Sequence, residues 1–215
     1  MSVPKLDKIP KYVLKGTTTI GVVCRDGIIF ATDTRATMGY FVAHKRAKKV
    51  LKIDDHLAMT IAGAVGDAQA VVEILKANAN LFRCENGRPM PVKSAARLLA
   101  NLLFSSRMVP LLLQALVGGV DESGPHIFAL DPLGSVTEEN CVSTGSGSPV
   151  AYGVLESEFK ENMSEKEALP IIVKAIGSAM KRDAASGDSF DVAVVTGEGY
   201  RELPEDEKKA ALANA

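Results

Sequence analysis

The sequence predicts an α+β fold in which antiparallel sheets carry helices on their outer faces. The first observation is the order of the periodic segments, which runs strands, a helix pair, strands, a second helix pair and strands. A doubly wound fold would alternate strand and helix, so the grouped order favours antiparallel sheets with helices packed outside them. The second observation is length, because 215 residues fit one domain with a substantial core.

Two hairpins are expected in the first part of the chain. Residues 17–24 and 28–34 are rich in β-branched and apolar side chains, and the Arg-Asp-Gly between them has good turn chemistry. Residues 49–53 and 57–62 repeat the pattern around Asp-Asp-His. Each pair of runs is therefore expected to form two antiparallel strands.

Two helices should follow these hairpins. From Asp67 to Phe82 the apolar residues recur at helical spacing, and the pattern stops before Asn86 and Gly87. A second helix is expected over residues 92–108, where the stripe is apolar on nearly every side. We expect these two helices to pack as a pair.

The second half of the chain repeats this order. Strands are expected over residues 113–121, 125–131 and 135–143, separated by Glu-Ser-Gly and Pro-Leu-Gly turns. Helices are expected over residues 149–160 and from Ser164 to about Ala184, where Ser164 and Glu167 have the spacing of a capping box. Residues 190–196 and 200–203 close the set as strands, and residues 205–215 are expected to form a frayed surface helix.

Composition indicates a soluble globular protein. The chain is 47% hydrophobic and 24% charged with a net charge of -1, so neither disorder nor nucleic-acid binding is expected. Its three cysteines are far apart and include no CxxC pair, which argues against a disulfide framework or a zinc site and fits a reducing cytoplasm. The leader has no apolar signal region, and the most apolar later stretch, residues 109–120, is too short to span a bilayer. We therefore expect a cytoplasmic protein without nucleic-acid or membrane partners.

The segment from Lys15 to Thr19 joins a polar leader to an apolar strand and has two interpretations. It can be a glycine turn before threonines that start a strand. It can also hold an N-terminal nucleophile, because cleavage after Gly16 would give Thr17 a free α-amino group, with a pKa of about 8, beside its own hydroxyl. A threonine hydroxyl needs such a base to become a useful nucleophile. Gly16 lacks a Cβ, which permits the strained turn from which Thr17 could cut its own leader.

Several motifs in order resemble those of one family. They are KGTTTIGVVCRDGIIFATDTRATMG, KRAKKVLKI, AMTIAGAVGDAQ, STGSGSPVAYGVLE and SAMKRDAASGDSFDV. Together they resemble the β subunits of the 20S proteasome, especially the archaeal type, over nearly everything from Gly16 to Val195. The resemblance implies the N-terminal nucleophile hydrolase fold, a four-layer αββα sandwich of two antiparallel sheets flanked by helix pairs. It also implies that residues 1–16 are a propeptide removed by autocatalysis and that residues 17–215 form the catalytic domain.

The resemblance assigns Asp33 and Lys49 to the catalytic apparatus. A buried ammonium close to Thr17 Oγ would favour the alkoxide and take part in proton transfer, and Asp33 would keep the lysine charged and oriented. Read alone, Asp33 is a strand-end turn residue. Lys49 read alone belongs to the charge run at residues 45–49, which would usually be a solvated face.

Four further residues are assigned by the same resemblance. The backbone N–H of Gly63 would be the oxyanion donor, while Ser146, Asp183 and Ser186 would surround and orient the threonine amine. The alternatives are a plain strand-to-helix turn with Asp67 as N-cap, and ordinary turn residues after a helix for Asp183 and Ser186. The Gly-Ser-Gly-Ser loop lacks the lysine of a Walker motif and the spacing of a dinucleotide fingerprint, so nucleotide binding is not expected.

The resemblance also places uncharged residues around the primary specificity pocket, so cleavage after apolar residues is expected; they are Ala36, Thr37, Ile61 and Val65. No cofactor or metal is expected. His44, His56 and His126 have no partners at ligand or triad spacing and are expected on the surface or in turns. The GxSxG elbow of the α/β serine hydrolases is missing from the sequence.

The expected activity is that of a threonine endopeptidase subunit of the 20S proteasome, which hydrolyses unfolded proteins through an ester on Thr17. In the chain as written Thr17 is acylated by Gly16, so the sequence describes a zymogen. The expected partners are α subunits and other β subunits, in heptameric rings stacked four deep, and an ATP-dependent unfoldase or other regulatory cap.

Two alternatives to this activity stay open. One is a catalytically silent, structural subunit of the β ring. It is disfavoured because Gly16, Thr17, Asp33, Lys49 and Asp183 occur together. The other is a simpler bacterial threonine peptidase or a distant amidase of the same fold. It is disfavoured by the leader and by the full GSGS and KRDAASGD motifs.

Overall fold

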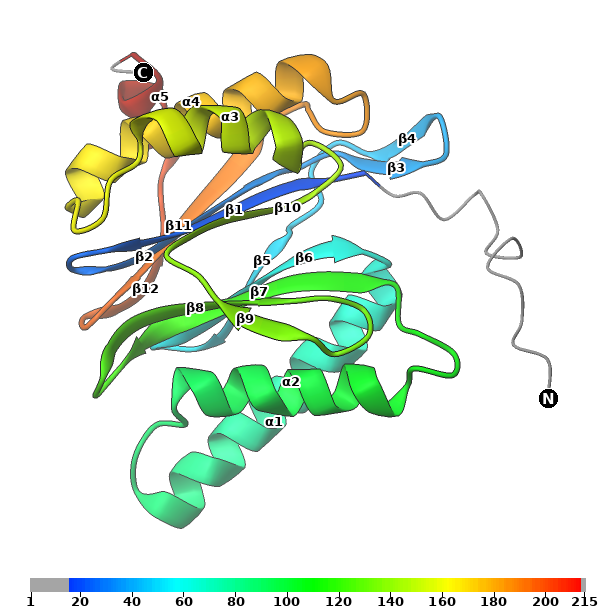
Figure 1. Ribbon diagram of the computed structural model, residues 1–215, viewed down its shortest axis with the longest axis vertical. Helices are drawn as coiled ribbons and strands as arrows, with labels where there is room; N and C mark the ends of the chain where they lie inside the picture. Colours follow the sequence, from blue (N-terminus) through cyan, green and yellow to red (C-terminus); the bar gives the residue numbers. More distant parts are fainter. Residues whose placement is uncertain (1–15, 214–215) are drawn as a thin grey trace.

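The computed structural model describes residues 16–213, so the expected leader up to residue 15 lies outside the described residues. Two five-stranded antiparallel sheets face each other, and helices cover the outer face of each (Figure 1). The α+β class and the four-layer sandwich are therefore confirmed. A small two-stranded sheet projects from one end of the sandwich (Figure 1).

The first sheet has the strand order β10-β1-β2-β11-β12. The strands are β10 (Cys141–Gly145), β1 (Thr18–Cys24), β2 (Gly27–Asp33), β11 (Phe190–Thr196) and β12 (Gly199–Glu202). Helices α3 (Ser148–Glu158) and α4 (Glu165–Arg182) lie on its outer face (Figure 1). The predicted capping box of α4 is confirmed. The Ser164 backbone N–H donates to Glu167 Oε2 at 2.8 Å, and the Ser164 side chain accepts the Glu167 backbone N–H.

The second sheet has the strand order β5-β6-β7-β8-β9. The strands are β5 (Val50–Asp54), β6 (Leu57–Gly63), β7 (Leu113–Asp121), β8 (Gly124–Leu130) and β9 (Val136–Glu138). Helices α1 (Val65–Asn86) and α2 (Val92–Ser105) cover its outer face (Figure 1). Helix α1 ends at Asn86, one residue beyond the predicted stop, where Gly87 adopts φ +67° and its N–H donates to the Arg83 carbonyl.

The core consists of three apolar layers, one under each helix pair and one between the sheets. Phe30 and Ile28 of β2 meet Leu116 and Ile127 of the second sheet in the middle layer. Each strand of the central pair β1–β2 is buried on both faces, which matches its nearly continuous apolar sequence.

The predicted strand over residues 135–143 is wrong, because this segment forms two strands in different sheets. β9 pairs with β8, whereas β10 pairs with β1. At the crossover the Glu139 N–H donates to the Ile127 carbonyl at 3.0 Å and the Asn140 carbonyl accepts from Val23 N–H at 2.8 Å. Successive residues therefore bond to opposite sheets, and the apolar pattern does not reveal this change.

Two further expectations are corrected at the ends of elements. Helix α2 ends at Ser105 rather than near Met108. The tail helix α5 (Glu205–Ala213) is not frayed but packed, since Lys208 is buried and donates to the Phe190 carbonyl at 2.9 Å. The short hairpin of β3 (Ala36–Met38) and β4 (Phe41–His44) was not predicted. Within residues 16–213, no helix has the length and apolar character needed to cross a membrane.

Candidate active site

Thr17 lies directly before β1 and is almost fully buried. Its backbone N–H donates to Ser146 Oγ at 3.2 Å. The N–H of the preceding Gly16 donates to Thr37 Oγ1 at 3.3 Å. A side chain at Gly16 would overlap the Ala185 methyl group, so the lack of a Cβ is required by space.

Ser146, Asp183 and Ser186 meet beside the Thr17 backbone. Ser146 Oγ and Ser186 Oγ both donate to Asp183 Oδ2, each at 2.6 Å. Ser186 Oγ also lies 2.8 Å from Thr18 Oγ1. Because Ser146 donates its single proton to Asp183, its oxygen is free to accept from Thr17 N–H, and the three groups form a directed hydrogen-bond chain. Asp183 is also the C-cap residue of α4, so its helix-end interpretation holds at the same time.

Asp33 and Lys49 form a buried ion pair next to the start of β1, where Asp33 Oδ1 accepts the Thr18 N–H at 3.0 Å. Lys49 Nζ lies 2.8 Å from Asp33 Oδ1 and also donates to the Arg35 carbonyl at 2.5 Å. Burial lowers the pKa of Lys49, and the Asp33 carboxylate only partly offsets this effect. The solvated-face interpretation of the charge run is therefore wrong for Lys49, although its neighbour Lys48 is exposed and pairs with Glu202.

Gly63 ends β6 immediately before α1 and adopts φ +135°. A Cβ at this position would overlap the Leu112 carbonyl oxygen, so only glycine fits here. The same carbonyl accepts the Ala64 N–H at 2.7 Å. Asp67 is not the N-cap: Ala64 occupies that position, and Asp67 Oδ2 instead accepts the Leu112 N–H at 3.0 Å.

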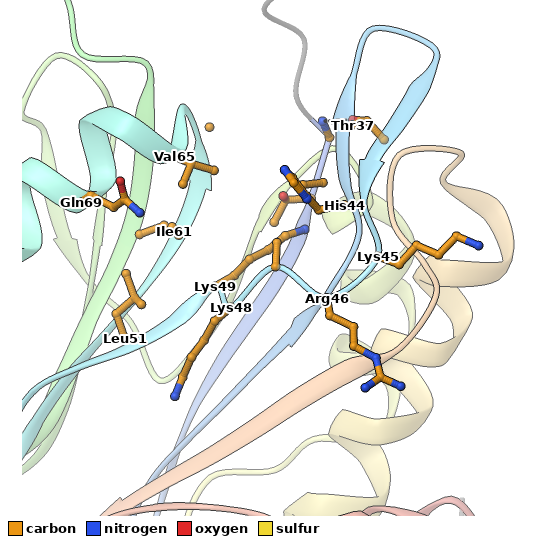
Figure 2. Close-up of a pocket in the computed structure, with 15 residues that line it drawn as sticks. Thr37, His44, Lys45, Arg46, Lys48, Lys49, Leu51, Ile61, Val65 and Gln69 are labelled. Atoms are coloured by element: carbon orange, nitrogen blue, oxygen red, sulfur yellow. Dashed lines mark hydrogen bonds between the residues drawn. The ribbon is translucent and has the colours of Figure 1, made fainter.

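A pocket of about 640 Å³ opens beside Thr17. All four residues expected around the specificity pocket line it, together with Gly16, Lys49 and Gly63; the four are Ala36, Thr37, Ile61 and Val65. Figure 2 shows Ile61 and Val65 on one wall and Thr37 on the opposite wall, with Lys49 between them. The side chains of Lys45 and Arg46 point away from the centre (Figure 2).

The pocket contains residues that sequence reasoning missed. Leu51 of β5 lies two residues after Lys49, and Gln69 lies one helical turn after Val65 on α1. Strand and helix periodicity place these side chains on the same faces as Lys49 and Val65, so both could have been predicted to line the pocket. His44 lines the pocket from β4. No sequence pattern placed it there, because the β3–β4 hairpin was not predicted.

The other two histidines lie away from this pocket. His56 lies in the turn between β5 and β6, as expected, and its largely buried side chain places Nε2 2.8 Å from the Met90 carbonyl oxygen. His126 Nδ1 lies 2.6 Å from Glu138 Oε1 on the second sheet. No group of three or more metal-ligating side chains occurs in the part of the chain that the structure describes.

This four-layer sandwich, with Thr17 directly before β1 of the first sheet, is the fold of the N-terminal nucleophile hydrolases. A family model described as "Proteasome subunit" matches residues 13–195. The chain belongs to the proteasome subunit family and is of its β type. It is thus a member of a protease family.

Three relatives named "Proteasome subunit beta" illustrate the similarity. The protein of Methanocaldococcus vulcanius is 52% identical over 203 residues, which cover 94% of this chain and 91% of the relative. The protein of Methanosarcina barkeri is 51% identical over 205 residues, covering 95% and 97%. The protein of Methanothermobacter thermautotrophicus is 50% identical over 205 residues, covering 95% and 98%.

Proposed function

We propose that the chain is a threonine endopeptidase subunit whose nucleophile is Thr17. The observation that carries the proposal is the directed chain from the Thr17 nitrogen through Ser146 Oγ to Asp183 Oδ2, at 3.2 and 2.6 Å. A nucleophile whose own amine is the base needs a group that orients this amine, and the chain supplies one. The adjoining pocket provides room for the acyl side of a substrate.

The first reaction of the proposed enzyme is removal of residues 1–16. Thr17 Oγ attacks the Gly16 carbonyl carbon, the Gly16–Thr17 C–N bond breaks, and the Oγ proton passes to the departing nitrogen, so that an ester forms on Oγ and Thr17 gains a free amine. Water then hydrolyses this ester, which releases the leader as a carboxylate and restores the hydroxyl. Residues 17–215 are proposed as the mature catalytic domain.

Substrate hydrolysis repeats the same chemistry in trans. Thr17 Oγ gives its proton to the free amine and attacks the scissile carbonyl, while the Gly63 N–H is proposed to stabilise the oxyanion. The amine returns the proton to the leaving nitrogen and then activates the water that cleaves the ester. The lowered pKa of Lys49 supports a role for this ammonium, held by Asp33, in the same proton transfers.

The pocket supports a preference for apolar side chains before the cleaved bond. Ile61 is buried, Val65 is exposed, and Ala36 and Leu51 add further apolar lining beside the Lys49 side chain. Lys45 and Arg46 also line the pocket, but their side chains point away from its centre (Figure 2), so they do not contradict this preference.

Partners and location are also proposals. We propose that the chain assembles with α subunits and other β subunits in heptameric rings stacked four deep. A regulatory or ATP-dependent unfoldase cap would deliver unfolded proteins to a cytoplasmic particle. The names of the relatives, all proteasome subunits, support assembly of this kind.

The test is co-expression with a proteasome α subunit, followed by determination of the β N-terminus and an assay with an apolar fluorogenic peptide. Wild type should begin at Thr17 and hydrolyse the peptide. Thr17→Ala should keep its leader and be inactive, whereas the matched control Thr17→Ser, which retains a hydroxyl, should keep measurable activity. A complete particle whose β chain still begins at Met1, without hydrolysis, would contradict the proposal and favour the structural β-ring subunit.

A further inference from the structure

Arg35 contacts the candidate site through both its backbone and its side chain. It follows the end of β2, two residues after Asp33. Its N–H donates to Asp33 Oδ2 at 3.0 Å, and its carbonyl accepts the Lys49 ammonium at 2.5 Å. Its guanidinium reaches the loop after α4, where Nε lies 2.8 Å from Asp188 Oδ2 and Nη1 donates to the Ala184 carbonyl at 2.9 Å.

The loop that Arg35 holds, residues 183–188, carries two of the groups around Thr17. Asp183 and Ser186 lie on it, on either side of the Ala184 carbonyl that Arg35 binds. The loop also returns to the ion pair, because the Gly187 N–H donates to Asp33 Oδ2 at 3.1 Å. A side chain at Gly187 would overlap the guanidinium, so the arginine packs against bare backbone.

We propose that the Arg35–Asp188 pair is a positioning device, which holds the 183–188 loop against Asp33 and thereby sets where the Thr17 amine sits. The proposal rests on the function proposed above. Arg35 acts through Asp33, Lys49 and the loop, so it is a positioning residue. The Arg35 side chain thus joins the two sides of the site, one at Asp33 and Lys49 and the other after α4, in addition to the Gly187 N–H that reaches Asp33.

The chemistry of arginine suits this task. Its planar fork can hold the Asp188 carboxylate and the Ala184 carbonyl at the same time, whereas a lysine ammonium offers no such rigid pair of donors. The hydrogen bond from Arg35 lowers the pKa of Asp188 below its ordinary value, so the pair is charged at neutral pH. Asp188 adopts φ +65°, which asparagine and aspartate tolerate better than other side chains.

The Arg35–Asp188 pair is partly exposed, so its effect on the position of the loop can be measured without a large effect on folding. Its side chains are 24% and 21% accessible, and exposed ion pairs contribute little to global stability. Variants at these positions should therefore fold and assemble. Their effect should appear in the kinetics, because a small displacement of reacting groups has a large effect on rate.

The test uses the co-expressed particle with Arg35→Met, Arg35→Lys, Asp188→Asn and the double variant Arg35→Met with Asp188→Asn. Arg35→Met should lower kcat about 10- to 100-fold with little change in KM, and should shift the pH profile of kcat/KM. Arg35→Lys should recover part of the rate. Asp188→Asn should lose less than Arg35→Met, since the Ala184 contact remains, and the double variant should be no worse than Arg35→Met.

A matched control exists at the other end of the β1–β2 hairpin. Arg25 also holds a loop carbonyl, that of Asn162, through Nε at 3.3 Å and Nη2 at 3.0 Å, and Asn162 also has a positive φ of 63°. Arg25→Met removes the same kind of contact far from Thr17. It should hydrolyse the peptide at the wild-type rate with the wild-type pH profile.

The proposal is overturned if assembled Arg35→Met particles show the wild-type rate and pH profile. If Arg35→Met does not assemble, Asp188→Asn decides, and wild-type kinetics in that variant overturn the proposal. Failure of the proposed function would look different. In that case the wild-type particle itself would not hydrolyse the peptide, or Thr17→Ala would be as active as wild type.

Discussion

The Lys49 ammonium lies 2.8 Å from Asp33 Oδ1, and both side chains are buried. The two partners differ in the number of further hydrogen bonds that they make. Asp33 also accepts N–H groups from Thr18 at 3.0 Å, Arg35 at 3.0 Å and Gly187 at 3.1 Å. Among residues 16–213, Lys49 has one other acceptor, the Arg35 carbonyl. The carboxylate therefore organises three separate backbone segments, whereas the ammonium serves mainly the ion pair.

This asymmetry predicts that Asp33→Asn destabilises the protein more than Lys49→Met. The NH₂ group of the new asparagine would face N–H donors, and the buried Lys49 ammonium would lose its counter-charge. Loss of one partner of a buried ion pair lowers the free energy of unfolding by about 3–5 kcal/mol. After Lys49→Met, the carboxylate keeps its three N–H donors, so the loss should be less than half as large. Urea unfolding of the separately expressed subunit, followed by circular dichroism, measures both. Equal losses would show that the backbone donors do not support Asp33.

The lowered pKa of Lys49 predicts a pH dependence of stability. Above the lowered folded-state pKa and below the ordinary value of 10.5, the unfolded chain binds a proton at this site that the folded chain does not. The free energy of unfolding therefore gains a positive slope with pH in this window. The difference in unfolding free energy between wild type and Lys49→Met should rise as pH increases toward 10.5. A flat difference would mean that burial does not shift this ammonium.

The contact between Gly16 and Ala185 predicts a size-complementation experiment. Gly16→Ala should slow leader removal, because the new methyl group would overlap the Ala185 methyl and displace the scissile carbonyl. Adding Ala185→Gly should recover part of the rate, while Ala185→Gly alone should process normally. Mass spectrometry of the β chain during assembly follows the cleavage. No recovery in the double variant would place the effect of Gly16 elsewhere, for example at Ser146 Oγ, which also lies close.

The three cysteines should differ sharply in reactivity. Burial raises the pKa of Cys24 to about 12 and that of Cys141 to about 11, whereas Cys84 is exposed on α1. Since the thiolate is the reacting form, iodoacetamide at a pH of about 8 should modify Cys84 first in the separately expressed subunit. Peptide mapping identifies the site, and Cys84→Ser should remove nearly all rapid labelling. Rapid labelling of Cys141 would contradict its burial.

Local sequence patterns predicted most elements because their physical causes are local. The capping box at Ser164 and Glu167, the stop at Gly87 and the hairpin turns depend on residues a few positions apart. The prediction failed where neighbours in sequence belong to different sheets, as at Glu139 and Asn140. It also failed at the β3–β4 hairpin, whose Tyr40 and Phe41 are exposed apolar residues and so give no pattern of burial.

For the candidate site too, the sequence predicted some features and the tertiary structure decided others. The resemblance of the motifs assigned Thr17, Asp33, Lys49, Gly63 and Asp183 by position, and the structure brings them to one end of the sandwich; their catalytic roles stay predictions. A charge run has the same composition whether it is solvated or not, so only the order of the strands decided that Lys49 is buried beside Asp33 while Lys48 is exposed.

By itself, the sequence determined the α+β class, most element positions and the family, because periodicity and caps are properties of short segments and the order of the motifs can be read directly along the chain. Tertiary structure alone decided the contacts between distant segments. Ser146 meets Asp183 across 37 positions, and Arg35 meets Asp188 across 153. Such pairs form only when strand pairing brings β2, β10 and the end of α4 together, and no local pattern encodes that pairing.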